Sequence, residues 1–291
     1  STSAAENIKS FVSGGFGGVC AVLVGHPFDL TKTRLQTAAP GAYTGAIDVV
    51  KKTVAKDGLT GLYRGVIPPL LGVTPIFAVS FWAYDASKKL LFAATPKRES
   101  SSLSTSELAL AGFLSAVPTT LVTAPVERAK VLLQVQGQGG SEVKYKGVTD
   151  VLKHLYKEGG IRSIFRGTGA TLARDGPGSA AYFAAYEVTK KALTPAGSSP
   201  ADLNLQAIII AGGTAGVAMW AIAIPPDVSV KLSAPSGTYS GIMDCMRKTI
   251  AADGIGALWK GFGPAMARAF PANAATFLGV EASRKLLDGL F

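Results

Sequence analysis

The stretch GHPFDLTKTRLQ, residues 25–36, decides the fold of this chain. It closes a segment, residues 11–28, that contains no Asp, Glu, Lys or Arg, and charged residues then follow a proline at once. A proline inside a helix removes a backbone hydrogen bond and kinks the helix. Asp29 and Lys32 are three residues apart and therefore share one helix face. The stretch predicts a kinked apolar helix with an acid and a base at its kink.

The same pattern recurs twice along the chain. PFDLTK at residue 27 returns as PVERAK at 125 and, with its base displaced, as PPDVSV at 225. Three further blocks recur in the same order, in the versions DGLTGLYRG, EGGIRSIFRG and DGIGALWKG; YTG, YKG and YSG; and YDASK, YEVTK and VEASR. Four ordered blocks define a three-fold repeat. We expect repeats at residues 1–100, 101–199 and 200–291 that form one transmembrane domain.

The composition places these repeats in a membrane. Of 291 residues, 48% are hydrophobic and 16% are charged, below the roughly 25% charged residues of soluble proteins. The net charge of +10 fits basic loops at anionic lipid headgroups better than nucleic acid, for which the sequence has no binding signature. Two cysteines make no disulfide framework, and the N-terminal residues lack the pattern of a secretory signal. Without a nucleophile constellation, metal-ligand spacing or phosphate loop, we expect no enzyme activity, metal or cofactor.

Apolar windows of membrane-spanning length fall twice in each repeat. Four windows carry no charge, and two others, residues 172–186 and 265–280, are interrupted by Arg174, Asp175 and Arg268. The four uncharged windows are residues 10–28, 65–84, 108–126 and 203–226. We predict an all-α membrane protein with six transmembrane helices, in three pseudo-three-fold repeats around a central cavity, and short helices in the polar segments.

These blocks resemble the mitochondrial carrier family over essentially the whole chain. The family pattern is Pro-Xaa-acid-Xaa-Xaa-base on odd-numbered helices, an aromatic-base-Gly segment on the matrix side, and aromatic-acid-Xaa-Xaa-base on even-numbered helices. The resemblance implies a multi-pass, monomeric solute carrier of the mitochondrial inner membrane that works by alternating access. It also implies contacts with cardiolipin at six glycines, because backbone amides at helix starts bind phosphate. These glycines are Gly45, Gly65, Gly147, Gly167, Gly241 and Gly261.

Two rings of charged residues follow from the repeats. The lower ring, a matrix gate in this family, is braced by glutamines and comprises Asp29, Lys32, Glu127, Lys130, Asp227, Gln36 and Gln134. The upper ring, a cytoplasmic gate, comprises Asp85, Lys88, Glu187, Lys190, Glu281 and Arg284. Ion pairs suit a gate that must break, because each contributes little net free energy.

The third repeat departs from the pattern. Val230 stands where the other repeats have lysine, Lys231 follows it, and Ala234 occupies the glutamine position. One residue rotates a side chain by about 100° around a helix. We therefore expect Asp227 to lack a base on its own face, which leaves two good acid–base units in the lower ring. The alternative is a local helix distortion that brings Lys231 across.

Unlike residues at equivalent positions locate the cargo site. Beside the prolines of the second helix of each repeat, the pairs are Gly72 and Val73, Arg174 and Asp175, and Arg268 and Ala269. Arginine grips a carboxylate through two hydrogen bonds, and Asp175 can neutralise a cation. We expect a zwitterionic cargo with an apolar part near Val73. Nearby aromatic residues either face a quaternary ammonium or acyl tail or face lipid; they are Phe77, Phe81 and Trp82.

Three stretches narrow the substrate class. GHPFDLTKTRLQT, RDGPGSAAYFAAYE and RAFPANAATFLGVE are similar to family members that exchange acylcarnitine for carnitine. That resemblance implies substrate-binding roles for Arg174, Asp175, Arg268, Lys32, Glu127 and His26. A carrier of basic amino acids such as ornithine is an alternative, although it would need a second acid at Val73 or Ala269. A transport-inactive scaffold with the carrier fold is another.

Overall fold

The computed structural model describes residues 3–97, 103–136, 138, 143–198, 204–233, 235 and 239–290. Within these ranges the chain is helical and has no strand, which confirms the predicted all-α fold. Six helices are long: α1 (Ser3–Thr37), α3 (Ile67–Ala94), α4 (Thr105–Val135), α7 (Thr168–Leu193), α8 (Leu205–Ser233) and α10 (Phe262–Leu290). Each contains a proline in its interior: Pro27, Pro75, Pro118 and Pro125, Pro177, Pro225 and Pro226, and Pro271.

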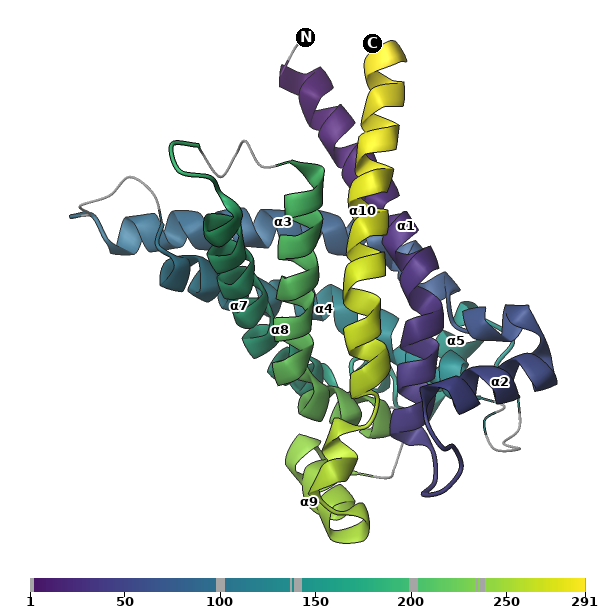
Figure 1. Cartoon of the computed structure of the whole chain (residues 1–291). Coiled ribbons are helices and arrows are strands. Elements are labelled where there is room, and N and C mark those ends of the chain that lie inside the picture. The colour runs from purple at the N-terminus through teal and green to yellow at the C-terminus, as the bar shows by residue number, and fades with distance from the viewer. Residues whose placement is uncertain are drawn as a thin grey trace.

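The long helices enclose a central space. Around the ring, α1 packs on α10, α10 on α8, α8 on α7, α7 on α4 and α4 on α3, and α3 also contacts α1. Both chain termini lie at one end of the molecule (Figure 1). Helices from all three repeats therefore face one another, and residues far apart in the sequence meet at the centre.

Shorter helices lie toward the opposite end (Figure 1). Each repeat has a twelve-residue helix there: α2 (Ala46–Asp57), α5 (Val148–Gly159) and α9 (Ile242–Asp253). Each is followed by a shorter turn of helix: η1 (Leu59–Tyr63), α6 (Ile161–Ile164) and η4 (Ile255–Trp259). Gly58, Gly160 and Gly254 separate the two with φ of 75°, 67° and 83°, which is the left-handed region that favours glycine.

Small residues bring the long helices together. A Cβ added at Gly17 of α1 would lie 2.7 Å from the carbonyl oxygen of Thr276 on α10, and one at Gly18 would lie 2.9 Å from Val73 of α3. A side chain at either position would therefore push the helices apart. In lipid, where apolar burial does not drive helices together, such contacts supply the packing energy.

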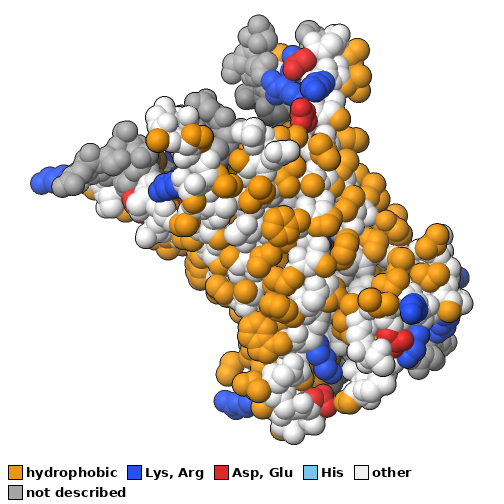
Figure 2. Space-filling model, in the orientation of Figure 1, with side chains coloured by type: hydrophobic (Ala, Val, Ile, Leu, Met, Phe, Trp, Pro, Cys, Tyr) orange, Lys and Arg blue, Asp and Glu red, His pale blue; other side chains and the backbone are white. Residues whose placement is uncertain are grey.

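The outer surface fits a bilayer. Large apolar side chains cover the long helices, and in Figure 2 most visible charged groups gather near the two ends. Among the described residues, α1, η1 with α3, α4 and α8 are long and apolar enough to cross a membrane by composition alone. Helices α7 and α10 carry Arg174, Asp175 and Arg268, as the interrupted windows predict.

Candidate functional site

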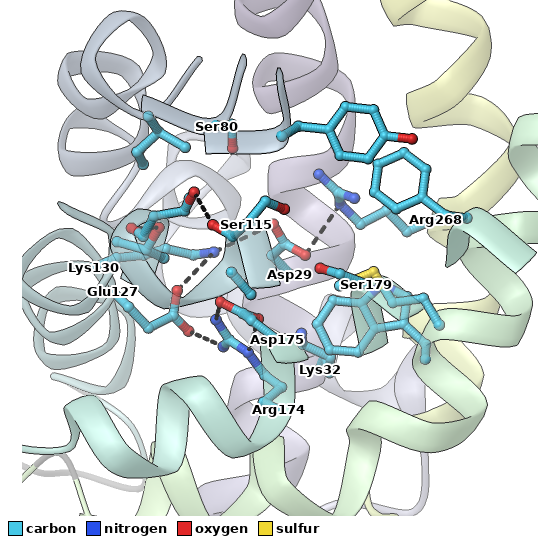
Figure 3. A pocket seen from close by; sticks show the side chains of 18 residues that line it. Asp29, Lys32, Ser80, Ser115, Glu127, Lys130, Arg174, Asp175, Ser179 and Arg268 are labelled. Atoms are coloured by element: carbon cyan, nitrogen blue, oxygen red, sulfur yellow. Dashed lines mark hydrogen bonds and ion pairs between the residues drawn. The ribbon is translucent and has the colours of Figure 1, made fainter. Parts of the chain in front are cut away.

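The six long helices surround a cavity of about 560 Å³, and each contributes to its wall. Its charged residues lie within five residues of a helix proline, after it on α1 and α4 and before it on α7 and α10. Their side chains point toward one space (Figure 3). The charged lining residues are Asp29, Lys32, Glu127, Lys130, Arg174, Asp175 and Arg268. Four basic and three acidic side chains therefore face one space, and an excess of positive charge in a membrane favours a cargo that carries a carboxylate.

The lower ring is closed by contacts between repeats. Lys130 of α4 lies 3.5 Å from Asp29 of α1, and Lys32 of α1 lies 3.2 Å from Asp227 of α8. Lys231 of α8 completes the circuit by an ion pair with Glu127 of α4. All three acids thus meet a base from another repeat, which is the arrangement expected of a closed gate.

The prediction that Asp227 lacks a base on its own face was wrong. Lys231 is buried and lies 3.3 Å from Asp227 as well as against Glu127. Three residues along a helix turn a side chain about 60° short of a full revolution, and four turn it about 40° beyond, so both positions lie on the same face. The displaced lysine therefore reaches the ring from within helix α8, which is continuous from Leu205 to Ser233.

The predicted glutamine braces differ from one another. Gln36 donates to Asp227 at 2.9 Å and supports the lower ring directly. Gln134 accepts from the hydroxyl of Thr33 at 3.0 Å, so it links α4 to α1 beside the ring. Ala234, the third position, lies outside the described residues.

Arg174 belongs to the lower ring as well as to the cavity. Its Nη1 lies 2.9 Å from Glu127 and 3.0 Å from Asp227, and its Nε lies 2.8 Å from Asp175. Its side chain is only 6% exposed. The predicted pairing with Asp175 is present, but the guanidinium is already held by three carboxylates. A cargo carboxylate that reaches Arg174 has to compete with these three carboxylates for the guanidinium.

Arg268 is the more accessible arginine. Its side chain is 25% exposed, and its Nε lies 3.2 Å from Asp29. The guanidinium packs over Gly25, where an added Cβ would lie 2.5 Å from Nε and 2.8 Å from Nη2. The glycine of the GHPFD stretch therefore makes room for the arginine of α10, and Arg268 presents its remaining donors to the cavity (Figure 3).

Two predicted cargo residues do not line the cavity. Val73 packs against Gly18 of α1, whereas Ile76 and Ser80 of α3 contribute to the wall. His26 is buried, its Nε2 lies 2.6 Å from the carbonyl oxygen of Arg64, and its ring stacks on Tyr63. His26 thus joins α1, next to Pro27, to the segment around the end of η1.

These contacts give His26 a structural role rather than a role in cargo binding, and substitution can test this. Because a carbonyl only accepts, Nε2 must donate, and glutamine can place an amide donor similarly. We expect His26→Gln to retain the melting temperature and the cargo KM, whereas His26→Ala leaves the carbonyl of Arg64 unpaired and costs about 1–3 kcal/mol. Thermal unfolding and transport assays measure both quantities. A raised KM in the stable glutamine variant would instead indicate a cargo contact.

The aromatic residues divide differently from the prediction. Trp82 is 64% exposed on the outer surface and is absent from the cavity wall. The side chains of Phe77 and Phe81 lie outside the described part of the structure. The wall instead contains Trp220 of α8, whose ring lies 3.8 Å from the Lys32 ammonium. Comparing the first helices of the repeats signals this residue, because Trp220 stands against Val22 and Thr120.

The described members of the upper ring pair within their own helices. Glu187 lies 4.0 Å from Lys190, Glu281 lies 3.4 Å from Lys285, and Arg284 lies 3.5 Å from Asp288. Lys88 lies over the ring of Tyr84 at 5.0 Å. The side chain of Asp85 is outside the described residues. These contacts lie within single helices, whereas the ion pairs of the lower ring join different repeats.

The six predicted lipid-contact glycines occupy two kinds of position. Gly45, Gly147 and Gly241 precede α2, α5 and α9, whereas Gly65, Gly167 and Gly261 have φ of 76°, 86° and 85°. A second cavity, of about 600 Å³, brings Gly45 together with Gly261, and Tyr43 and Lys260 also line it. In the next pair of repeats, Arg166 donates to the carbonyl of Tyr239 at 2.7 Å. Neighbouring repeats therefore meet at these motifs.

Polar contacts fix the loops before all three of these helices, and before α5 the backbone amide of Lys146 donates to Asp150 at 3.0 Å. The backbone amide of Thr44 donates to Asp48, and this bond together with Lys52 lowers the pKa of the Asp48 carboxyl. The amide of Ser240 and Lys248 likewise lower the pKa of Asp244. Both acids are therefore charged at neutral pH and hold the helix starts in place.

Comparison with known proteins agrees with this architecture. A family profile described as "Mitochondrial carrier protein" matches residues 3–95, 101–197 and 201–290. The chain is 47% identical over 289 residues to the mitochondrial carnitine/acylcarnitine carrier protein of Mus musculus, covering 96% of this chain and 94% of that protein. It is 48% identical over 295 residues to the mitochondrial carnitine carrier of Saccharomyces cerevisiae, covering 97% and 88%. It is 43% identical over 289 residues to mitochondrial magnesium exporter 1 of Drosophila melanogaster, covering 96% and 95%. The three matched repeats and these identities show that the chain belongs to the mitochondrial carrier family.

Proposed function

We propose that this inner-membrane carrier exchanges acylcarnitine for carnitine by alternating access. The observation that carries the proposal is the partly exposed Arg268, which faces a cavity that also holds carboxylates and an aromatic wall. A zwitterion with a quaternary ammonium matches this combination. The identities to carnitine carriers support the same substrate class.

The geometry supports a route from binding to gate opening. Arg268 holds Asp29, which also holds Lys130 of the lower ring. A cargo carboxylate on Arg268 competes with Asp29, and Arg174 offers the same competition for Glu127 and Asp227. Cargo thus replaces contacts that keep the ring shut, so binding energy is spent on the conformational change.

Counter-exchange in liposomes tests this function. Purified carrier in liposomes loaded with carnitine should take up labelled carnitine, and unlabelled acylcarnitine outside should compete. Ornithine should compete poorly, because no acid stands at Val73 or Ala269 to hold a second ammonium. Uptake that needs no internal carnitine would reject exchange, and uptake of labelled ornithine alone would reject the substrate class.

Two alternative functions, a transport-inactive scaffold and a carrier of divalent cations, have less support. An incomplete third repeat would favour a transport-inactive scaffold, but Lys231 completes the lower ring. A divalent cation, which the name of the Drosophila relative suggests, would meet four basic side chains against three acidic ones in the cavity. A net positive lining repels such an ion.

The second cavity suits an anionic phospholipid such as cardiolipin, and we propose this lipid for it. Lys260 supplies a cation, and the start of α2 supplies backbone amides beside Gly45. Added cardiolipin should raise the melting temperature of the delipidated carrier, and Lys260→Glu should reduce that rise. Lys285→Glu, on exposed α10 surface at the other end, is the matched control. Equal shifts in both variants would contradict a site in this cavity.

A further inference from the structure

Trp220 presents one face of its indole to the cavity and already holds a cation there. The Lys32 ammonium lies 3.8 Å from the ring centroid, while the same nitrogen lies 3.2 Å from Asp227. Lys32 is one of the labelled residues around the cavity in Figure 3. The indole ring is therefore placed so that its π-electrons can stabilise a cation in the cavity.

The acidic groups of the cavity are poorly placed for a quaternary ammonium. Asp29 contacts Lys130 and Arg268, Glu127 contacts Lys130, Arg174 and Lys231, and Asp175 contacts Arg174. All three carboxylates in the cavity wall thus have basic partners that donate hydrogen bonds. A trimethylammonium group has no hydrogen to donate, so it cannot replace such partners on equal terms. An aromatic face is the better match.

The other aromatic residues of the wall are less suitable. Tyr84 and Phe183 stack on one another at 4.6 Å between centroids, with an interplanar angle of 10°, so each ring covers one face of the other. Lys88 lies over Tyr84. The remaining tryptophans, Trp82 and Trp259, are 64% and 45% exposed and are not part of the wall. Trp220 is therefore the tryptophan that serves the cavity.

We propose that the face of Trp220 is the subsite for the quaternary ammonium of the cargo, and that Lys32 occupies it in the unloaded carrier. This inference rests on the proposed function for the identity of the cargo. When the cargo enters, its head group replaces Lys32 on the ring, and Lys32 keeps Asp227 as its partner. Arg268 then receives the carboxylate at the other end of the zwitterion.

Binding measurements test the subsite separately from transport. In the Trp82→Phe/Trp259→Phe variant, Trp220 is the only tryptophan left. Tetramethylammonium, which corresponds to the head group of carnitine alone, should then change the fluorescence of Trp220. The added substitution Lys32→Gln should make the response appear at lower concentration, because the competing cation is gone. An unchanged spectrum in both proteins would overturn the proposal, whether or not the carrier transports carnitine.

Competition assays measure specificity. Trp220→Leu should weaken carnitine binding by about thirtyfold, which corresponds to the free energy of a desolvated cation–π contact. It should leave the binding of the isostere 3-hydroxy-5,5-dimethylhexanoate unchanged, because a neutral tert-butyl group replaces the trimethylammonium there. Fluorinated tryptophans, which withdraw π-electron density without changing shape, should weaken carnitine stepwise. Equal loss for carnitine and the isostere, or no trend with fluorination, would show that Trp220 only packs. Failure of the unsubstituted carrier to exchange carnitine would instead count against the proposed function, with the tetramethylammonium measurement still deciding the subsite.

Discussion

Lys231→Ala should destabilise the closed lower ring by about 3 kcal/mol or more, because it leaves buried acids short of a base. Asp227 is fully buried, and Glu127 is 7% exposed, so solvent does not replace the lost ammonium. The empty carrier should unfold at lower temperature. Exchange should fall by about tenfold or more, because the state closed at this ring is less populated.

The double variant Val230→Lys/Lys231→Val is the matched control. It moves the base to three residues from Asp227, where the other repeats have it. Since both spacings share one helix face, we expect most of the stability and transport to return. If Lys231→Ala has the melting temperature and rate of the unsubstituted carrier, the ring does not depend on this lysine.

Arg268→Gln should raise the KM for carnitine by about tenfold to a hundredfold, which is the range of one lost charged hydrogen bond. Arg268→Lys keeps the charge but loses the planar fork, so it should recover only part of the affinity. The effect should disappear for carnitine methyl ester, which has no carboxylate. Concentration series of uptake into loaded liposomes measure these values.

Gly25→Ala tests the same arginine without removing it. The added methyl group would lie 2.5 Å from Nε of Arg268, so the guanidinium must shift. We expect a KM between those of the unsubstituted carrier and Arg268→Gln. Gly15→Ala is the control on the same helix, because its added Cβ would meet nothing within 4 Å. Equal KM values in the two alanine variants would refute the idea that Gly25 positions Arg268.

Much of the fold could be predicted because the repeat states it three times. One copy of Pro-Phe-Asp would have been weak, but three copies fixed both the kinked helices and the acids that meet at the centre. The prediction for Lys231 was wrong because it compared the direction of Lys231 with that of its neighbour Val230. The rotation between adjacent residues does not decide whether a residue shares a helix face with a third one. The relevant reference was Asp227, from which Val230 and Lys231 lie on opposite sides of the same stripe.

The cavity residues were harder to predict. Arg174 and Arg268 are equivalent in the sequence, yet one is locked among carboxylates and the other is a quarter exposed. That difference depends on which acids the neighbouring helices bring near, which no local pattern encodes. His26 precedes the kink proline and resembles a cargo residue, but its ring turns toward Arg64. Trp220 could be found from the sequence only by comparing the first helices of the three repeats as well as the second ones.

Asp227 gathers Lys32, Gln36, Arg174 and Lys231 around one carboxylate at the convergence of the helices. A small ion that enters the cavity meets an acid that already has four hydrogen-bonding or charged partners, and it brings too few contacts to release all four together. The closed ring thus blocks the passage of small ions. An organelle that stores energy as a proton gradient can hold many copies of such a protein without losing its voltage through them.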